Sequence, residues 1–226
     1  MNWFEELLNN RALETALPSA IWETVVMVGI SGVATVLIGG IIGIILHLTR
    51  PGGLVPMRWT YAILSSIIVN ITRSIPYAIL MVALIPFTQW LVGTSIGPVA
   101  ATVSLTIATA PFFARLVETS LREVPSGTVD AAQVMGMSNG QIVTKVFLPE
   151  ALPGLIAAIT NTTVVLIGYS AMAGLIGGGG LGRLAYNYGY QRFDSQIMIV
   201  TIVVIVIGVQ LIQWIGDKIV AAVDHR

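Results

Sequence analysis

Long stretches without a charged residue alternate with short polar segments along this chain. No Asp, Glu, Lys or Arg occurs in Thr24–Thr49, Ser74–Ala114, Ala151–Gly182 or Ser195–Gly216. Each stretch matches or exceeds the about 20 residues that a helix needs to cross the hydrocarbon core of a bilayer. The pattern therefore predicts an all-α polytopic membrane protein.

Turn and breaker residues divide these stretches into about five spans. Pro76 and Pro86 interrupt the second span, which is therefore long or broken, and a count of six spans is the main alternative. The run Pro51-Gly52-Gly53 ends the first span, and the segment from Gly93 to Gly97 turns the second into the third. The predicted spans are Thr24–Leu48, Tyr61–Trp90, Ile96–Val117, Pro153–Ile176 and Ile197–Ile215.

The first 20 residues are expected to form a separate interfacial segment, before a transmembrane domain over residues 21–226. Trp3, Phe4, Leu7 and Leu8 are spaced for one face of a short amphipathic helix, and Pro18 is expected to break it. The acidic residues in this segment argue against a cleavable signal peptide.

The composition excludes several function classes. Hydrophobic residues make up 55% of the chain and charged residues 10%, against roughly 25% charged residues in a soluble domain. The net charge is zero, which gives nucleic-acid binding no electrostatic basis. The chain has no cysteine, so it has no disulfide or thiolate metal site, and no metal is expected.

The distribution of Lys and Arg predicts the orientation in the membrane. With the amino terminus outside, three basic residues face outward: Arg11, Arg183 and Arg192. Seven then face the cytoplasm: Arg50, Arg58, Arg115, Arg122, Lys145, Lys218 and Arg226. Positive charge collects on the cytoplasmic side, so the sequence predicts a carboxyl terminus in the cytoplasm and an inner-membrane location.

A polar insert at about residues 122–150 lies between the third and fourth spans and is expected in the cytoplasm. Ser126 or Thr128 is a candidate cap for a first short helix, which Gly136 ends. Ser138 and Gln141 have capping-box spacing for a second helix from Asn139 to about Phe147. Since Pro149 disfavours helical angles at Leu148, the second helix is expected to stop there.

The insert has both small and bulky apolar side chains that a partner surface could use. Ala131 and Ala132 would let another backbone approach closely, and five residues are expected to offer apolar area: Val129, Met135, Ile142, Val146 and Phe147. An amphipathic loop resting on lipid headgroups is the alternative. A DNA-reading helix-turn-helix is disfavoured, because the segment has more acidic than basic residues.

The spacing within the insert resembles the loop signature of bacterial ABC importer permeases: Glu-Ala-Ala, three residues, Gly, nine residues, Ile-x-Leu-Pro. Here Asp130-Ala131-Ala132, Gly136, Val146 and Leu148-Pro149 hold those places, with Asp for Glu and Val for Ile. The resemblance implies a type I ABC importer permease fold, whose coupling helix docks on a separate cytoplasmic ATPase.

Other segments extend the resemblance to the permease of the methionine importer from about Ile21 onward. They are Asn70–Pro76, Pro149–Gly154, Gly168–Met172, Gly177–Gly182 and Tyr186–Tyr190. The resemblance implies a homodimer, two ATPase subunits, an extracytoplasmic substrate-binding protein and surrounding lipid. A permease for another amino acid or an osmoprotectant is the alternative.

The chain is not expected to be an enzyme or to hold a cofactor. Neither lysine stands in a phosphate-binding P-loop, so ATP and Mg²⁺ are expected on the partner ATPase. Gly177–Gly180 is expected to form a tight or re-entrant turn. The chain lacks a histidine placed to serve as the base of an intramembrane serine protease, which disfavours that alternative. A passive channel is the other alternative, but it would give the insert no function.

Polar residues within apolar spans are the candidates for the translocation pathway. Arg73 either faces the pathway or binds backbone carbonyls freed by the break at Pro76. Asn70, Tyr169, Ser170 and Met172 either line the pathway or make helix-packing contacts. Tyr186, Tyr188 and Tyr190 are expected to form an interfacial aromatic belt or to contact the binding protein.

Overall fold

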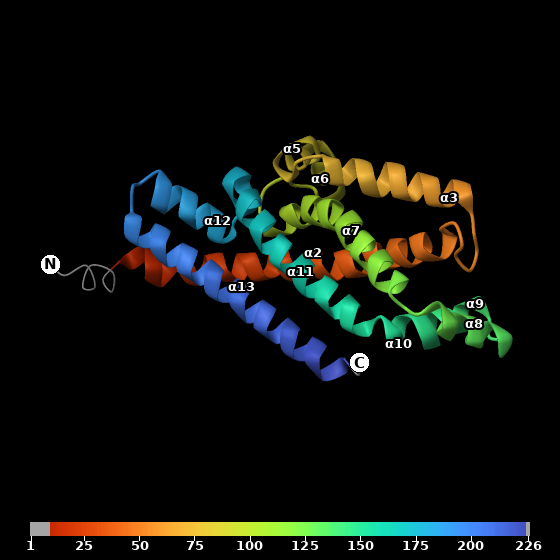
Figure 1. Cartoon of the computed structure of the whole chain (residues 1–226). Helices are drawn as coiled ribbons and strands as arrows, with labels where there is room; N and C mark the ends of the chain where they lie inside the picture. The colour runs from red at the N-terminus through yellow and green to blue at the C-terminus, as the bar shows by residue number, and fades with distance from the viewer. Residues whose placement is uncertain (1–9, 225–226) are drawn as a thin grey trace. The chain divides into compact units, whose positions relative to one another are not determined.

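The structure is a computed structural model that describes residues 10–224, apart from the side chains of Arg11 and Ala12, and its regular elements there are all helical (Figure 1). The predicted amphipathic helix around Trp3 and Leu8 lies outside the described residues. The all-α class predicted from the apolar stretches is confirmed.

The first long helix, α2, spans Arg11–Thr49 and contains Pro18. The prediction that Pro18 breaks the chain is therefore wrong, and the boundary placed after residue 20 falls inside a continuous helix. Proline removes one backbone donor, the N–H that would bind the Glu14 carbonyl, and α2 continues without it. The loss of this single hydrogen bond does not interrupt a helix of 39 residues.

The second predicted span is broken, as Pro76 indicated. A helical rod runs from Arg58 to Ser74 and bends by 101° into Tyr77–Ala83. Ile75, just before the proline, has extended backbone angles, which is the conformation that a following proline favours. The pieces are α3 (Arg58–Ala62), π-helical η1 (Ile63–Ile71), α4 (Thr72–Ser74), α5 (Tyr77–Ala83) and α6 (Ile85–Val92).

Three further long helices match the remaining predicted spans: α7 (Pro98–Arg122), α11 (Leu152–Ala173) and α13 (Ser195–Val223). Within residues 10–224, four helices are long and apolar enough to cross a membrane, and five spans result if the bent pair counts as one. This agrees with the predicted count of about five. The shorter elements are α8 (Ser126–Val134), α9 (Asn139–Ile142), η2 (Val143–Phe147), α10 (Leu148–Glu150), η3 (Gly174–Gly178), α12 (Gly180–Leu184) and η4 (Ala185–Tyr190).

The described chain divides into two compact units. Of the described residues, the first contains 10–33, 76–107 and 163–212, and the second contains 34–75, 108–162 and 213–224. In the second unit, α2 and α7 approach closely at Gly43, where an added Cβ would lie 2.6 Å from the Ala114 carbonyl oxygen. Thr35 and Thr109 share a hydrogen bond of 2.7 Å between the same two helices. Small residues therefore serve helix packing here, as in many membrane proteins.

Candidate functional site: a helix-turn-helix insert and its supports

The first helix of the insert between α7 and α11 ends at Gly136, as predicted. Gly136 has a left-handed φ of 77° and ends α8. Its N–H donates to the Gln133 carbonyl at 2.9 Å, and the Met137 N–H donates to the Ala132 carbonyl at 3.1 Å. This pair of bonds is a Schellman motif, which satisfies the last carbonyls of the helix.

The start of the second helix is also as predicted. Ser138 caps α9, accepting the Gln141 N–H at 3.4 Å, while the Gln141 side chain accepts the Ser138 N–H at 2.8 Å. The prediction for the first helix was wrong in detail. Its N-cap is Pro125, with no side-chain hydrogen bond, so neither Ser126 nor Thr128 acts as the cap.

The second helix does not stop before Pro149. Leu148 has helical angles, and the chain continues through η2 and α10 to Glu150. The π-helical turn η2 shifts the hydrogen-bonding register one residue, and Pro149 then stands in the first turn of α10, where no amide donor is required. The predicted stop at Leu148 is wrong because it holds only for an uninterrupted α-helical register.

Most of the bulky residues of the insert face the core of the second unit. Ile142, Val146 and Phe147 are buried, and they pack with Ala132 against residues of α7. The expectation that these three bulky side chains offer apolar area to a partner is therefore wrong. Ala131 remains exposed, whereas Ala132 is 1% exposed, so the alanine pair does not form one open face.

The exposed apolar surface of the insert lies at its turn. Val134 is 89% exposed and Met135 is 74% exposed, directly before Gly136. Met135 is among the residues expected to offer apolar area and Val134 is not, although a helix that ends at Gly136 places both at its end. We call Val134, Met135 and Gly136 the insert tip. It has the exposure and apolar character of a contact surface.

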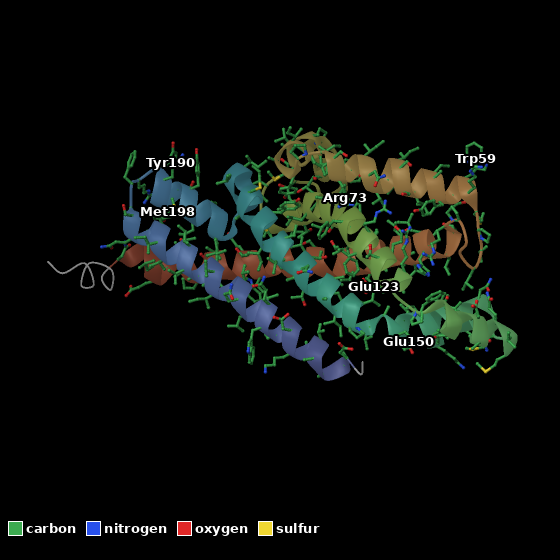
Figure 2. The ribbon with its side chains drawn as sticks, in the orientation of Figure 1. Trp59, Arg73, Glu123, Glu150, Tyr190 and Met198 are labelled. Atoms are coloured by element: carbon green, nitrogen blue, oxygen red, sulfur yellow. The ribbon has the colours of Figure 1, made fainter. Side chains whose placement is uncertain are left out.

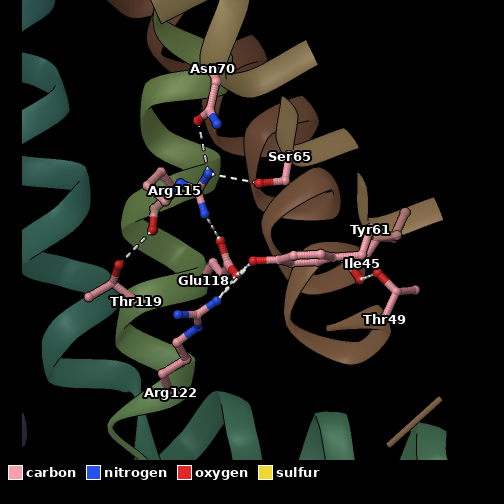
Figure 3. Close-up of polar contacts among 9 residues, drawn as sticks. All are labelled: Ile45, Thr49, Tyr61, Ser65, Asn70, Arg115, Glu118, Thr119 and Arg122. Atoms are coloured by element: carbon pink, nitrogen blue, oxygen red, sulfur yellow. Dashed lines mark hydrogen bonds and ion pairs between the residues drawn. The ribbon is translucent and has the colours of Figure 1, made fainter. Parts of the chain in front are cut away.

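A charged cluster joins α7 to the helical rod Arg58–Ser74, which we call the second-span rod (Figure 3). The Glu118 carboxylate is 1% exposed and accepts ion pairs from Arg115, at 2.6 Å, and from Arg122. Arg122 and Glu118 both contact the Tyr61 hydroxyl, at 3.1 and 3.3 Å. The sequence analysis missed this cluster, although basic residues three before and four after a lone Glu on one helix are a recognisable signal.

The two candidate pathway residues of the second unit make different contacts. The Arg115 guanidinium donates to the Asn70 side-chain oxygen and to the Ser65 hydroxyl, both at 3.0 Å. Asn70 therefore belongs to the charged cluster. Arg73 is exposed, and its guanidinium lies 5.9 Å from the centre of the Phe112 ring. Figure 2 labels its position on the second-span rod.

The other three pathway candidates lie in the first unit. Tyr169 stacks on Tyr77, with ring centres 4.3 Å apart and planes inclined by 3°. Ser170 is buried and donates to the Ile167 carbonyl at 2.8 Å, which is a packing contact within α11. Met172 is 38% exposed. Tyr77, which follows the break at Pro76, is therefore the stacking partner of the candidate Tyr169, and no local sequence signal predicts this contact.

The glycine run Gly177–Gly180 forms the predicted turn, and Glu23 of α2 holds it in place. Gly177, Gly179 and Gly180 all have positive φ. The Glu23 carboxylate accepts the Gly180 N–H at 2.6 Å and pairs with Arg183 at 2.9 Å. The Gly97 N–H donates to the Gly177 carbonyl at 2.9 Å, so the turn is fixed from two sides.

The three tyrosines lie on η4. The rings of Tyr186 and Tyr190 stack with centres 5.6 Å apart, and Arg192 covers the Tyr188 ring at 4.3 Å. Tyr190 is 63% exposed and is labelled in Figure 2. Among residues 10–224, no group of three or more His, Cys, Asp or Glu side chains is placed to hold a metal ion.

Membrane-length helices with a helix-turn-helix insert between two of them give this chain the architecture of a multi-pass membrane protein. The model of the binding-protein-dependent transport system inner membrane component family matches residues 39–226. The chain belongs to this family.

Relatives and solved structures agree with this assignment. The chain is 50% identical over 224 residues to the probable D-methionine transport system permease protein MetI of Vibrio cholerae, covering 99% of this chain and 96% of that protein. It is 47% identical over 182 residues to the methionine import system permease protein MetP of Bacillus subtilis, covering 80% and 82%. A solved inward-facing MetNI methionine ABC transporter matches with a TM-score of 0.93 and 48% identity, over 96% of this chain and 100% of that one. The fold is the type I ABC importer permease fold.

Proposed function

We propose that this chain is the membrane permease subunit of an ATP-driven methionine importer. It forms the translocation pathway and carries no ATPase site of its own. The observation that carries the proposal is the insert: its motif residues stand at family spacing, and it ends in an exposed apolar tip at Val134 and Met135. The relatives are methionine permeases, which supplies methionine as the substrate class.

In the proposed assembly, two copies of the chain pair in the inner membrane, amino termini outside and carboxyl termini in the cytoplasm. Two ATPase subunits bind the two inserts, and ATP and Mg²⁺ bind only to those subunits. An extracytoplasmic binding protein delivers substrate near Tyr186, Tyr188 and Tyr190. Asn70, Arg73, Tyr169, Ser170 and Met172 are the candidate pathway residues, and the best candidates are Tyr169 and Met172 of α11.

The charged cluster fixes α7, the helix on which the insert packs, to the second-span rod. Docking transmits force only if the insert moves with its membrane helices rather than folding independently. The insert residues Ile142, Val146 and Phe147 pack on α7, and Glu118 of the same helix is bound to the second-span rod through Tyr61. Closure of the ATPase subunits therefore moves α7 and the rod together with the insert.

The test is uptake of radiolabelled methionine into proteoliposomes that contain the chain, its ATPase and its binding protein. Val134→Asp should lower ATP-driven uptake by about tenfold, because a charge at an apolar contact weakens docking by about 1.4 kcal/mol or more. Val55→Asp, on an exposed loop residue outside the insert, is the matched control. Unchanged uptake by Val134→Asp would refute docking through the insert tip.

Substrate identity is tested in the same vesicles. Excess unlabelled L-methionine or D-methionine should abolish the labelled uptake, and the ratio of their effects gives the stereochemical preference. An osmoprotectant or another amino acid that competes better than either would assign the alternative substrate.

A further inference from the structure

A polar cavity of about 540 Å³ lies within the second unit, between the end of α2 and the first helix of the insert. The residues that matter for its chemistry are His47, Arg50, Arg122, Asp130, Gln133 and Phe147. We call it the arginine cavity. Neither the transport pathway nor the docking of an ATPase on the insert tip accounts for it.

Two buried polar atoms at this cavity have no hydrogen-bond partner among the described residues. They are Nδ1 of His47 and Nε of Arg50. The His47 side chain is only 2% exposed, so bulk water does not satisfy it. Buried polar groups are nearly always hydrogen-bonded, and both of these atoms belong to residues that line the cavity.

The charges around the cavity are mixed. Arg122 already pairs with Glu118, so Arg50 is the guanidinium without a carboxylate partner among the described ion pairs. Asp130 contributes a carboxylate to the same wall. A simple anion would be attracted by Arg50 but repelled by Asp130. A ligand that carries both a phosphate and an ammonium group is complementary to both.

The position of the cavity along the chain indicates the source of such a ligand. Arg50 directly follows α2, whose apolar span ends at Thr49. The end of a membrane-spanning helix lies at the depth of the lipid headgroups, where basic pockets bind lipid phosphates.

We propose that the arginine cavity binds the phosphoethanolamine headgroup of a membrane phospholipid. The phosphate is held by Arg50, and the ammonium is held by Asp130. Arginine suits this role because its planar donors match phosphate oxygens.

A headgroup in this cavity touches the insert on two sides. Asp130 and Gln133 belong to α8, and the Phe147 ring of η2 lies edge-on to the His47 ring at 4.5 Å. The occupied cavity therefore ties the insert to the end of α2. The binding claim stands on the cavity alone, whereas its expected effect on transport rests on the proposed function.

The test is native mass spectrometry of the purified transporter complex, with phosphatidylethanolamine or phosphatidylglycerol added in equal amounts. The wild-type complex should retain phosphatidylethanolamine in preference to phosphatidylglycerol. Arg50→Gln should lower the retained phosphatidylethanolamine by about tenfold, since it removes a charge-assisted contact. Arg58→Gln, an exposed arginine eight positions later that does not line the cavity, is the matched control.

A second variant tests the ammonium contact separately. Asp130→Asn should abolish the preference for phosphatidylethanolamine while retaining binding of phosphatidylglycerol. Equal retention by Arg50→Gln and Arg58→Gln would overturn the proposal, as would an unchanged preference in Asp130→Asn. Loss of the ATPase subunits from Arg50→Gln with lipid retention intact would instead assign Arg50 to a protein contact and also overturn it.

Soluble phosphoethanolamine distinguishes a lipid from a free ligand. Added in millimolar excess, it should not displace the retained lipid, because the acyl chains supply most of the binding energy in a membrane site. Displacement would overturn the lipid assignment.

In proteoliposomes, replacing phosphatidylethanolamine by phosphatidylglycerol should lower wild-type uptake severalfold and leave the uptake of Arg50→Gln unaffected. If methionine uptake fails altogether while lipid retention follows the pattern above, the function is refuted and the site is not.

Discussion

The Glu23 carboxylate accepts the backbone N–H of Gly180 at 2.6 Å, although 157 positions separate the two residues. Thr24 adds a parallel contact, because its hydroxyl accepts the Leu181 N–H at 2.9 Å. A glycine-rich turn has many accessible conformations, so these two acceptors and Arg183 select one of them. α2 thereby sets the geometry of the turn that follows α11.

Replacing Glu23 should loosen this turn. Glu23→Gln removes the charge that pairs with Arg183, and the partly exposed pair should contribute about 1 kcal/mol or less. We expect lower methionine uptake and a lower midpoint of thermal unfolding in detergent. Glu14→Gln, an exposed glutamate on the same helix, is the control. Equal behaviour of the two variants would show that the contact has no role.

Replacing Glu118 in the charged cluster should lower the free energy of unfolding more than replacing Glu23 in the glycine turn. Glu118→Gln leaves Arg115 and Arg122 without a neutralising partner, although both retain some exposure. We expect a loss of about 2 kcal/mol, less than the about 3–5 kcal/mol seen for a fully buried pair. Denaturant unfolding of the detergent-solubilised protein measures it. The exposed Glu123→Gln on the segment after α7 should change stability by less than about 0.5 kcal/mol.

Because α2 packs closely on α7 at Gly43, any side chain larger than that of glycine at this position should destabilise the protein. In Gly43→Ala, the new methyl would lie 2.6 Å from the Ala114 carbonyl oxygen and 2.7 Å from Val117 Cβ. We expect a destabilisation of about 1–3 kcal/mol, because backbone must move. Gly40→Ala is the control, since its nearest contact is Phe113 Cε1 at 3.9 Å. Equal unfolding midpoints for the two variants would contradict the packing seen here.

The stacked rings of Tyr77 and Tyr169 predict a distinction between two variants. Tyr77→Phe keeps the stack and loses only the 3.3 Å hydrogen bond with Ser104. Tyr77→Ala loses the ring as well, including a stacking term of about 0.5–1.5 kcal/mol. Uptake should be nearly normal in Tyr77→Phe and clearly reduced in Tyr77→Ala. The opposite order would assign the role to the hydroxyl group.

Local sequence signals predicted the insert well where the interaction lies within a few residues. The capping box at Ser138 and the left-handed turn at Gly136 need only their neighbours, and both were recognisable from residue type and spacing. The burial of Ile142, Val146 and Phe147 was not recognisable, because it depends on α7 packing against them. The same holds for Leu148, whose helical angles depend on the π-helical turn before Pro149.

The sequence by itself determined that this is a helical membrane protein, where its spans lie, and that an insert with an importer-permease signature separates two of them. Those properties follow from the hydrophobicity and local capping preferences of consecutive residues. The tertiary structure alone decided which insert residues are exposed, that Glu118 joins α7 to the second-span rod, and that Glu23 holds the glycine turn. Those contacts join residues far apart in the chain, and their geometry depends on how whole helices pack.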